Sequence, residues 1–339
     1  TQLDAKSTAS NVTGLSDALI ETNSMYIGND PSSTTDDAKY NVAVGTTALD
    51  AIKTGDNNTA VGYDALTKNT TGNYNTASGS YALQENTEGN DNTASGGFVL
   101  QKNETGNQNT AIGMFALQLN TEGDQNTASG YAALSENETG NQNTASGIWA
   151  LESNISGHYN TASGSYALRG NIDGYRNTAS GHYALYKNID GDQNTASGSH
   201  ALQENNGDQN TASGSYALHK NETGKHNTAS GAYALQKNET GNSNIASGAY
   251  ALYKNIEGNN NTASGYAALK ENIVGNSNTA LGSYAGDIIT TGNHNVIIGR
   301  SADPSANNAS NQIVIGYNAT GTGNNQIALG NTSITAIKG

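Results

Sequence analysis

The sequence predicts an all-β protein, a parallel β-solenoid built from coils of 17 residues. Three observations predict this fold: a strict 17-residue repeat, short apolar segments punctuated by Gly and Asn, and little material for a large apolar core. Only 34% of the 339 residues are hydrophobic and 13% are charged, against about 45–50% and 25% in average domains. The 2 prolines, which would each delete a ladder hydrogen bond, both lie outside the main repeats.

The repeat is marked by the Gly that closes the motif Asn-Thr-Ala-Ser-Gly. Successive intervals are 17 residues from Gly45 to Gly316, except for one of 16 between Gly198 and Gly214, and a last interval of 14 leads to Gly330. A helix–turn–helix repeat takes about 33 residues or more, and no stretch has apolar residues at helical spacing. The repeats therefore predict β coils stacked about 4.8 Å apart.

Numbered from its first Asn, the unit is Asn-Thr-Ala-Ser-Gly-x-Tyr-Ala-Leu-x-x-Asn-x-x-Gly-x-x. We expect one short strand at Thr-Ala-Ser and a second at Tyr-Ala-Leu, with a tight bend at the Gly between them. The Asn-x-x-Gly at positions 12 to 15 predicts a wider turn of residues that tolerate positive φ.

Stacked coils place like side chains above one another, so the sequence predicts ladders. Asn forms the columns at positions 1 and 12, Ala those at 3 and 8, Leu that at 9, and aromatic residues that at 7. In three units the aromatic residue stands at position 6 instead, as Tyr63, Tyr131 and Tyr266.

The small number of apolar side chains in each coil predicts association between chains. Ordering a residue costs about 1.5 kcal/mol, and four modest apolar side chains offset only part of this for a 17-residue coil. By strand alternation, Ala at position 8 would point away from Leu at 9, so one of the two could not face the coil interior. We therefore expect a homotrimer around a common axis, with dimeric pairing by flat faces as the alternative.

Composition divides the chain into three parts. Residues 1–40 form an N-terminal capping or attachment segment, with a short helical turn near residues 16–21. Residues 41–300 form the β-solenoid shaft, and residues 301–339 form a C-terminal end with shorter-period coils. Position 4 is Ser in most central units and becomes apolar near the ends, as at Val44, Val61, Leu281, Ile298 and Ile315.

Charge and composition exclude several classes of protein. A net charge of -14, from 15 Lys and Arg against 29 Asp and Glu, argues against a nucleic-acid partner. No run of 18 apolar residues is present, so we expect no membrane insertion. The absence of Cys excludes disulfides and thiolate metal sites.

Two resemblances concern known repeats. The segments Asn41-Val-Ala-Val-Gly45 and Asn278-Thr-Ala-Leu-Gly282 resemble the head repeats of trimeric autotransporter adhesins, which implies a left-handed parallel β-roll of three chains. Those heads have a 14-residue motif, so this chain departs from them in its longer unit, in Ser at position 4 and in Tyr-Ala-Leu. The segments at residues 26–33, 41–50 and 329–335 are similar to parts of marine bacteriophage tail-fibre proteins, which implies a viral fibre.

The sequence predicts no enzyme, because catalysis needs unlike groups that converge, whereas a ladder supplies like groups along a line. We assign no catalytic, cofactor-binding or metal-ligating residue and expect no cofactor.

The histidines are expected at the surface: His158, His182, His200, His219, His226 and His294. The segment Ser197-Gly-Ser-His-Ala201 places His in the aromatic column and is not expected to be a nucleophile arrangement. Residues 89–92, Gly-Asn-Asp-Asn, resemble a calcium β-roll turn, but the neighbouring coils lack the required Asp, which favours a polar turn.

Three surface features remain. A mixed-charge solvated edge is expected from Glu88, Glu104, Glu122, Glu138, Asp173, Asp190, Lys68, Lys102, Lys187, Lys220, Lys237 and Lys254. Glycosylation stays open at the Asn-x-Ser/Thr sites, among them Asn103, Asn137, Asn154, Asn221 and Asn238. The Thr column at position 2, if it faces water, has the geometry of an ice-binding solenoid.

We therefore expect an extracellular, non-enzymatic structural fibre: the trimeric shaft of a phage tail fibre or virion appendage that supports host attachment. A host-surface receptor or glycan is the expected partner besides the chain itself. The alternatives are a cell-surface adhesin or matrix filament of the same fold and, secondly, an ice-binding solenoid.

Overall fold

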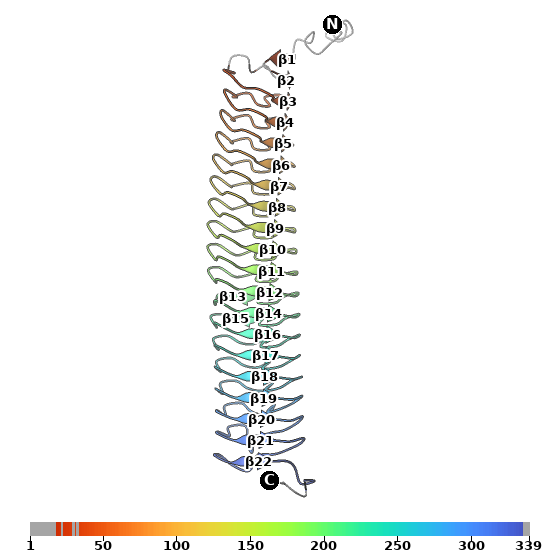
Figure 1. Ribbon diagram of the computed structural model, residues 1–339, viewed down its shortest axis with the longest axis vertical. Coiled ribbons are helices and arrows are strands. Elements are labelled where there is room, and N and C mark those ends of the chain that lie inside the picture. The colour runs from red at the N-terminus through yellow and green to blue at the C-terminus, as the bar shows by residue number, and fades with distance from the viewer. Residues whose placement is uncertain (1–17, 22, 29–30, 32–33, 335–339) are drawn as a thin grey trace. The chain divides into compact units, whose positions relative to one another are not determined.

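The computed structural model describes residues 18–21, 23–28, 31 and 34–334, which contain strands and turns and no helix. These residues belong to two compact units, Thr1–Asp173 and Gly174–Gly339. In each unit the coils stack in parallel, one strand above the next (Figure 1). The predicted all-β parallel solenoid with 17-residue coils is confirmed. No helix of the described residues is long and apolar enough to cross a membrane.

The first unit begins with a hairpin. Strand β1 (Ala18–Glu21) pairs antiparallel with β2 (Ser24–Ile27), which in turn pairs parallel with β3 (Val42–Val44). The helical turn expected near residues 16–21 is therefore wrong over its described part, and residues 16 and 17 lie outside the described residues. The following parallel strands are β3 (Val42–Val44), β4 (Thr59–Val61), β5 (Thr76–Ser78), β6 (Thr93–Ser95), β7 (Thr110–Ile112), β8 (Thr127–Ser129), β9 (Thr144–Ser146) and β10 (Thr161–Ser163).

The second unit continues the same pattern. Its parallel strands are β11 (Thr178–Ser180), β12 (Thr195–Ser197), β14 (Thr211–Ser213), β16 (Thr228–Ser230), β17 (Ile245–Ser247), β18 (Thr262–Ser264), β19 (Thr279–Leu281), β20 (Val296–Ile298), β21 (Ile313–Ile315) and β22 (Ile327–Leu329). A small second sheet joins β13 (Glu204–Asn205) to β15 (Lys220–Asn221) beside the 16-residue coil. The predicted shorter period appears at the end, where Ile313 pairs with Ile327.

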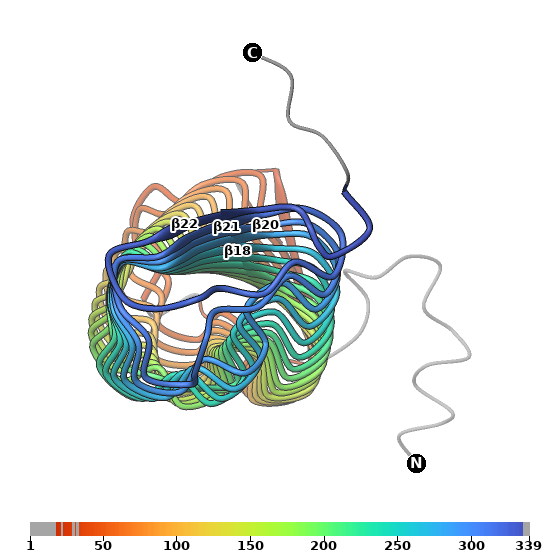
Figure 2. The ribbon, with the colours of Figure 1, turned by 90° about the horizontal axis from the view of Figure 1, so that it is seen from below.

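The strand at Thr-Ala-Ser forms as predicted, and its register pairs identical residues of neighbouring coils. Thr76, Ala77 and Ser78 of β5 pair with Thr93, Ala94 and Ser95 of β6. Ala points inward and is buried, whereas Thr and Ser point outward. In the second unit, Figure 2 shows β18 and β20 to β22 along one flat side of the coil.

The expected second strand at Tyr-Ala-Leu is wrong. Tyr81 and Leu83 have φ values of 61° and 51°, in the left-handed region, so the segment is a turn. Left-handed residues break the alternation of an extended chain, and Ala82 and Leu83 are both buried, with exposures of 0%. A single chain thus fills its own coil interior. The alternation premise for the homotrimer does not hold, and the homotrimer itself stays a prediction.

The predicted Asn ladders run through the buried interior. In the column at position 12, the Asn103 amide donates to Asn86 Oδ1 at 2.7 Å and receives a hydrogen bond from Asn120 at 2.8 Å. In the column at position 1, Asn75 donates from its backbone N–H to Asn58 Oδ1 at 3.0 Å. Because these amides bond to one another, the buried amides are largely satisfied along the coil axis. The exception is the last Asn of the column at position 12, because Asn272 Oδ1 is buried without a hydrogen-bond partner.

The Gly at position 15 is required for space. It does not supply the positive φ expected for the wide turn, because the left-handed residues lie at positions 5, 7, 9 and 17. The Gly89 carbonyl accepts hydrogen bonds from Asn75 at 2.8 Å and Asn86 at 3.1 Å, which closes the coil. A Cβ on Gly89 would lie 2.4 Å from Asn86 Oδ1 and 2.5 Å from the Gly106 carbonyl oxygen. The close approach of two coils therefore excludes a side chain here.

Candidate functional site

The outward side of the strands forms an uncharged surface, which we call the sheet face: positions 2 and 4 of each coil. Every residue there from β3 to β22 is Thr, Ser, Val, Ile or Leu. The side-chain hydroxyls of Thr76 and Ser78 make no hydrogen bond to the described residues, whereas the hydroxyl of Thr70, in the wide turn, donates to the Thr87 carbonyl at 3.1 Å. The sheet face thus presents free hydroxyls to solvent, and the Thr column faces outward.

The sheet face becomes apolar near its ends. Val44 and Val61 are 37% and 41% exposed in the first unit. In the second unit Leu281, Ile315 and Leu329 are 51%, 38% and 49% exposed. Isolated exposed apolar residues are ordinary, whereas these stand at position 4 of consecutive coils near each end of the described sheet.

The predicted aromatic column at position 7 is present and half-exposed. In the second unit the rings of Tyr216 and Tyr233 stack at 5.4 Å with an interplanar angle of 1°, and those of Tyr233 and Tyr250 at 5.1 Å and 7°. In the first unit Tyr81 stacks on Phe98 at 4.8 Å. Offset stacks of this kind add about 0.5–1.5 kcal/mol per pair beyond the area that they bury.

A third hydrogen-bonded ladder lies at position 16, and the sequence reasoning missed it. The backbone N–H of Asn73 donates to Asn90 Oδ1 at 2.9 Å, and that of Asn90 donates to Asn107 Oδ1 at 2.9 Å. Asp124 and His158 occupy the same column and also accept from backbone N–H groups. The residues at position 16 have in common a side-chain atom that accepts a hydrogen bond, and not one residue type.

The histidines differ in their surroundings. His182, His226 and His294 are exposed, as expected, whereas His158, His200 and His219 are half-buried. His200 stacks on Tyr216 at 4.6 Å, and burial lowers the pKa values of both His200 and His219. Ser199 Oγ lies 2.7 Å from His200 Nδ1. No carboxylate bonds to this imidazole among the described residues, so the contact lacks the third member of a nucleophilic triad.

Several lysines of the predicted charged edge pair with carboxylates of a neighbouring coil that the prediction did not name. Lys187 contacts Glu204 at 2.9 Å and Lys225 contacts Asp208 at 2.7 Å. In both pairs the hydrogen-bonded carboxylate raises the pKa of the lysine, and the ammonium lowers the pKa of the carboxyl. For the pKa of Asp208, desolvation opposes this lowering. Exposed pairs of this kind contribute about 0–1 kcal/mol.

Two carboxyl groups meet near the C-terminal end of the second unit. Burial and the neighbouring Asp287 raise the pKa of Asp303 to about 6. Burial also raises the pKa of Asp287. Among the described residues, no group of three or more His, Asp or Glu side chains is arranged to hold a metal ion.

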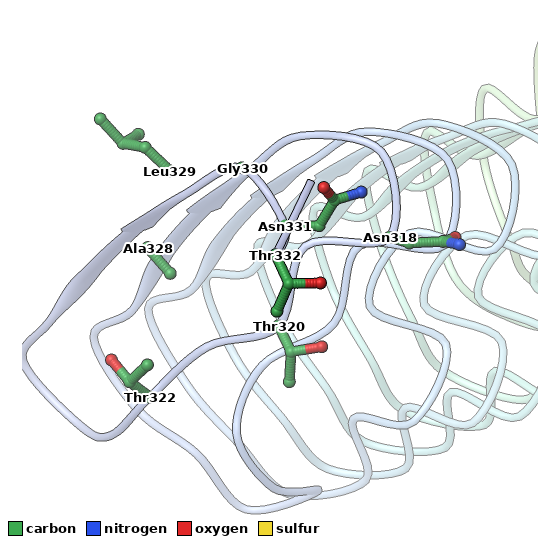
Figure 3. Close-up of a pocket in the computed structure, with 8 residues that line it drawn as sticks. All are labelled: Asn318, Thr320, Thr322, Ala328, Leu329, Gly330, Asn331 and Thr332. Atoms are coloured by element: carbon green, nitrogen blue, oxygen red, sulfur yellow. The ribbon is translucent and has the colours of Figure 1, made fainter. Parts of the chain in front are cut away.

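A hollow of about 580 Å³ opens at the last coil and is lined by Asn318, Thr320, Thr322, Ala328, Leu329, Gly330, Asn331 and Thr332 (Figure 3). In Figure 3 Ala328 points toward the coil interior, whereas Leu329 points away from it.

The structure shows the exposure of the Asn-x-Ser/Thr sites and the hydrogen bonding of the calcium-like turn at residues 89–92. Exposed Asn-x-Ser/Thr sites occur at Asn57, Asn260, Asn308 and Asn318, where glycosylation stays open. The five sites named from the sequence belong to the buried ladder at position 12: Asn103, Asn137, Asn154, Asn221 and Asn238 each have 0% exposure. An oligosaccharide cannot reach them in the folded protein. At the calcium-like turn, Asn90 belongs to the ladder at position 16 and its oxygen accepts hydrogen bonds, so the polar-turn interpretation describes it.

Comparison with protein families finds no family model that matches the chain, and comparison with characterised proteins finds no match. The similarity to adhesin head repeats and phage tail fibres therefore depends on the quoted motifs alone.

Proposed function

We propose that this protein is a non-enzymatic structural fibre, an extracellular shaft of a phage tail fibre or virion appendage that supports host attachment. The observation that carries the proposal is the repetition of the same interior hydrogen-bonded ladders in coil after coil. Such ladders give stiffness, and the titratable groups are distributed along columns instead of converging on one reacting centre. Within the described residues, neighbouring coils differ mainly in exposed side chains.

Three copies are proposed to associate through the sheet face. Each chain carries a net charge of -14, so like chains repel except along a surface without charge. The sheet face has no charged residue from β3 to β22, and its exposed apolar columns, such as Leu281 and Ile315, would gain by burial about 25 cal/mol per Å².

Molar mass by light scattering tests this association. We expect a trimer, and we expect Leu281→Lys combined with Ile315→Lys to lower the molar mass because charge would enter the contact. Ile189→Lys is the matched control, since Ile189 is 45% exposed in the wide turn and away from the sheet face. A folded monomer of the unaltered chain, or equal effects of the sheet-face and control variants, would overturn the association.

A cell-surface adhesin or matrix filament of the same fold is the alternative. In that setting the paired charges and the aromatic column would contact the ligand. Sequencing the intact gene and its neighbours separates the two settings: phage structural genes support the fibre, and a membrane anchor supports the adhesin.

Ice binding is a second candidate, favoured by one observation. The Thr and Ser hydroxyls of the sheet face point outward in parallel columns and lack protein partners, as at Thr76 and Ser78. This proposal and the trimer compete for one surface. Inhibition of ice recrystallisation by the unaltered chain, abolished by Thr161→Lys, supports ice binding. No inhibition, or inhibition that Thr161→Lys leaves intact, refutes it.

A further inference from the structure

The aromatic column of the second unit is interrupted at one coil. Ala267 stands at position 7, and the ring of that coil is carried by Tyr266 at position 6. The backbone is unchanged, because Ala267 has a φ of 54° where Tyr250 and Tyr284 have 60° and 59°. The interruption therefore removes a ring from the column without altering the coil.

The missing ring leaves a slot. Tyr266 lies at 70° to both Tyr250 and Tyr284, with ring centroids 6.0 Å and 5.3 Å away. In the uninterrupted column each ring face is covered by the next ring, as between Tyr233 and Tyr250 at 7°. At Ala267 the faces of Tyr250 and Tyr284 lose that parallel partner and border a cavity of about 140 Å³.

The slot has the size of one six-membered ring. Two coil steps of about 4.8 Å separate Tyr250 from Tyr284, and the Tyr266 ring occupies part of the gap between them. A guest therefore lies beside the Tyr266 ring, on the ring surfaces that border the cavity. A cavity of about 150 Å³ is known to hold benzene. The floor is the Ala267 methyl group, which is 1% exposed.

The rim of the slot is polar. Lys270 lines it together with Tyr266 and Tyr284, whose rings are in contact. Tyr266 is 48% exposed, so a bound guest would keep one side in water. The Lys270 ammonium disfavours a cationic guest, which aromatic rings alone would attract.

We propose that this slot binds the terminal pyranose ring of a glycan, with the ring C–H groups on the tyrosine faces and the hydroxyls bonded to Lys270 and to the tyrosine hydroxyls. The proposal rests on the proposed role in host attachment and names the ligand class for it. The first unit has the same interruption at Ala132, between Phe115 and Trp149, but Ser135 stands there in the place of Lys270. The complete set of ring faces and cation is therefore found at Ala267.

Titration of the full chain with methyl β-D-glucopyranoside and methyl β-D-galactopyranoside tests the site. With ¹³C-methyl alanine labelling, we expect the Ala267 methyl resonance to shift on addition of at least one of the sugars. Lys270→Ala is expected to weaken binding by about tenfold. Binding unaffected by this change would remove Lys270 from the site.

The matched variant is Tyr266→Ser combined with Ala267→Tyr, which restores the Ser-Tyr order of the next coil at Ser283 and Tyr284. It fills the slot with a ring that the coil already accommodates, so we expect an intact fold and loss of sugar binding by calorimetry. Persistent binding in this variant, no shift of Ala267 with either sugar, or a shift with p-cresol alone would overturn the proposal. Light scattering keeps the two proposals apart: sugar binding by a monomeric chain refutes the trimeric shaft only, and a trimer without sugar binding refutes the slot only.

Discussion

Removing one amide from the buried ladder at position 12 is expected to destabilise the coil far more than removing an exposed one. Asn103→Ala deletes three hydrogen bonds: to Asn86 Oδ1 at 2.7 Å, to the Gly106 carbonyl at 2.9 Å, and from Asn120 at 2.8 Å. The Gly106 carbonyl keeps its bond from Asn92 at 2.8 Å. Asn86 Oδ1 and one N–H of Asn120 are left buried without partners.

The magnitude follows from these two groups. A buried polar group without a partner costs about 1–3 kcal/mol, so we expect Asn103→Ala to lower the free energy of local opening by about 4 kcal/mol. Asn90→Ala is the control, because Asn90 belongs to the half-buried ladder at position 16 and water can replace its partners. We expect a loss of at most about 1 kcal/mol there.

Native-state hydrogen exchange measures both values coil by coil, which suits a repeat protein whose coils need not unfold together. We expect Asn103→Ala to raise exchange in its own coil and in the coils above and below. Equal losses for the two variants would refute the view that the interior ladder, rather than the outer hydrogen bonds, holds the coils together.

Three further predictions concern space, backbone and pH. Gly106→Ala would place a Cβ 2.5 Å from Asn103 Oδ1 and 2.6 Å from the Gly123 carbonyl oxygen, so we expect this substitution to lower the thermal unfolding midpoint strongly. Gly97→Ala is the control, because the nearest neighbour of its Cβ would be 4.0 Å away, and the midpoint should stay unchanged or rise slightly. A similar effect of both substitutions would contradict the steric role of Gly106. Gln125 is exposed and has a φ of 59°, in the left-handed region. In urea unfolding, Gln125→Asn should raise the free energy of unfolding by about 1 kcal/mol, and Gln125→Val should lower it. The reverse order would argue against left-handed strain at this position. Because the pKa of Asp303 is raised to about 6, its ionisation opposes folding: its contribution to the stability of the second unit should be fully present below about pH 4 and be lost as the pH rises through 6. Allowing for partial exposure, the loss is about 1 kcal/mol, and a pH dependence that persists in Asp303→Asn would contradict this source.

The sequence alone was sufficient for the period, the Thr-Ala-Ser strand and the ladders at positions 1 and 12, because each depends on identical residues recurring at one spacing. It failed at Tyr-Ala-Leu, because aromatic and aliphatic residues suggest a strand while the coil holds Tyr81 and Leu83 at positive φ. Such strain is set by closure of the whole coil and is invisible to local propensity.

The candidate surfaces were predicted unevenly. The aromatic column was evident from position 7, but the slot at Ala267 depends on how the Tyr266 ring turns across the gap, which side-chain packing decides. The ladder at position 16 mixes Asn, Asp and His, so residue identity hides a column that hydrogen-bond geometry defines.

Exchange of the asparagine side-chain amide protons tests the interior ladders most directly. In a chain labelled with ¹⁵N-asparagine, the side chains at positions 1 and 12, such as Asn75 and Asn103, are expected to exchange orders of magnitude more slowly than free asparagine, because both are fully buried and hydrogen-bonded. Those of the outer column, such as Asn90, should exchange much faster. Uniformly fast exchange at all three columns would contradict a solenoid held together by buried amides.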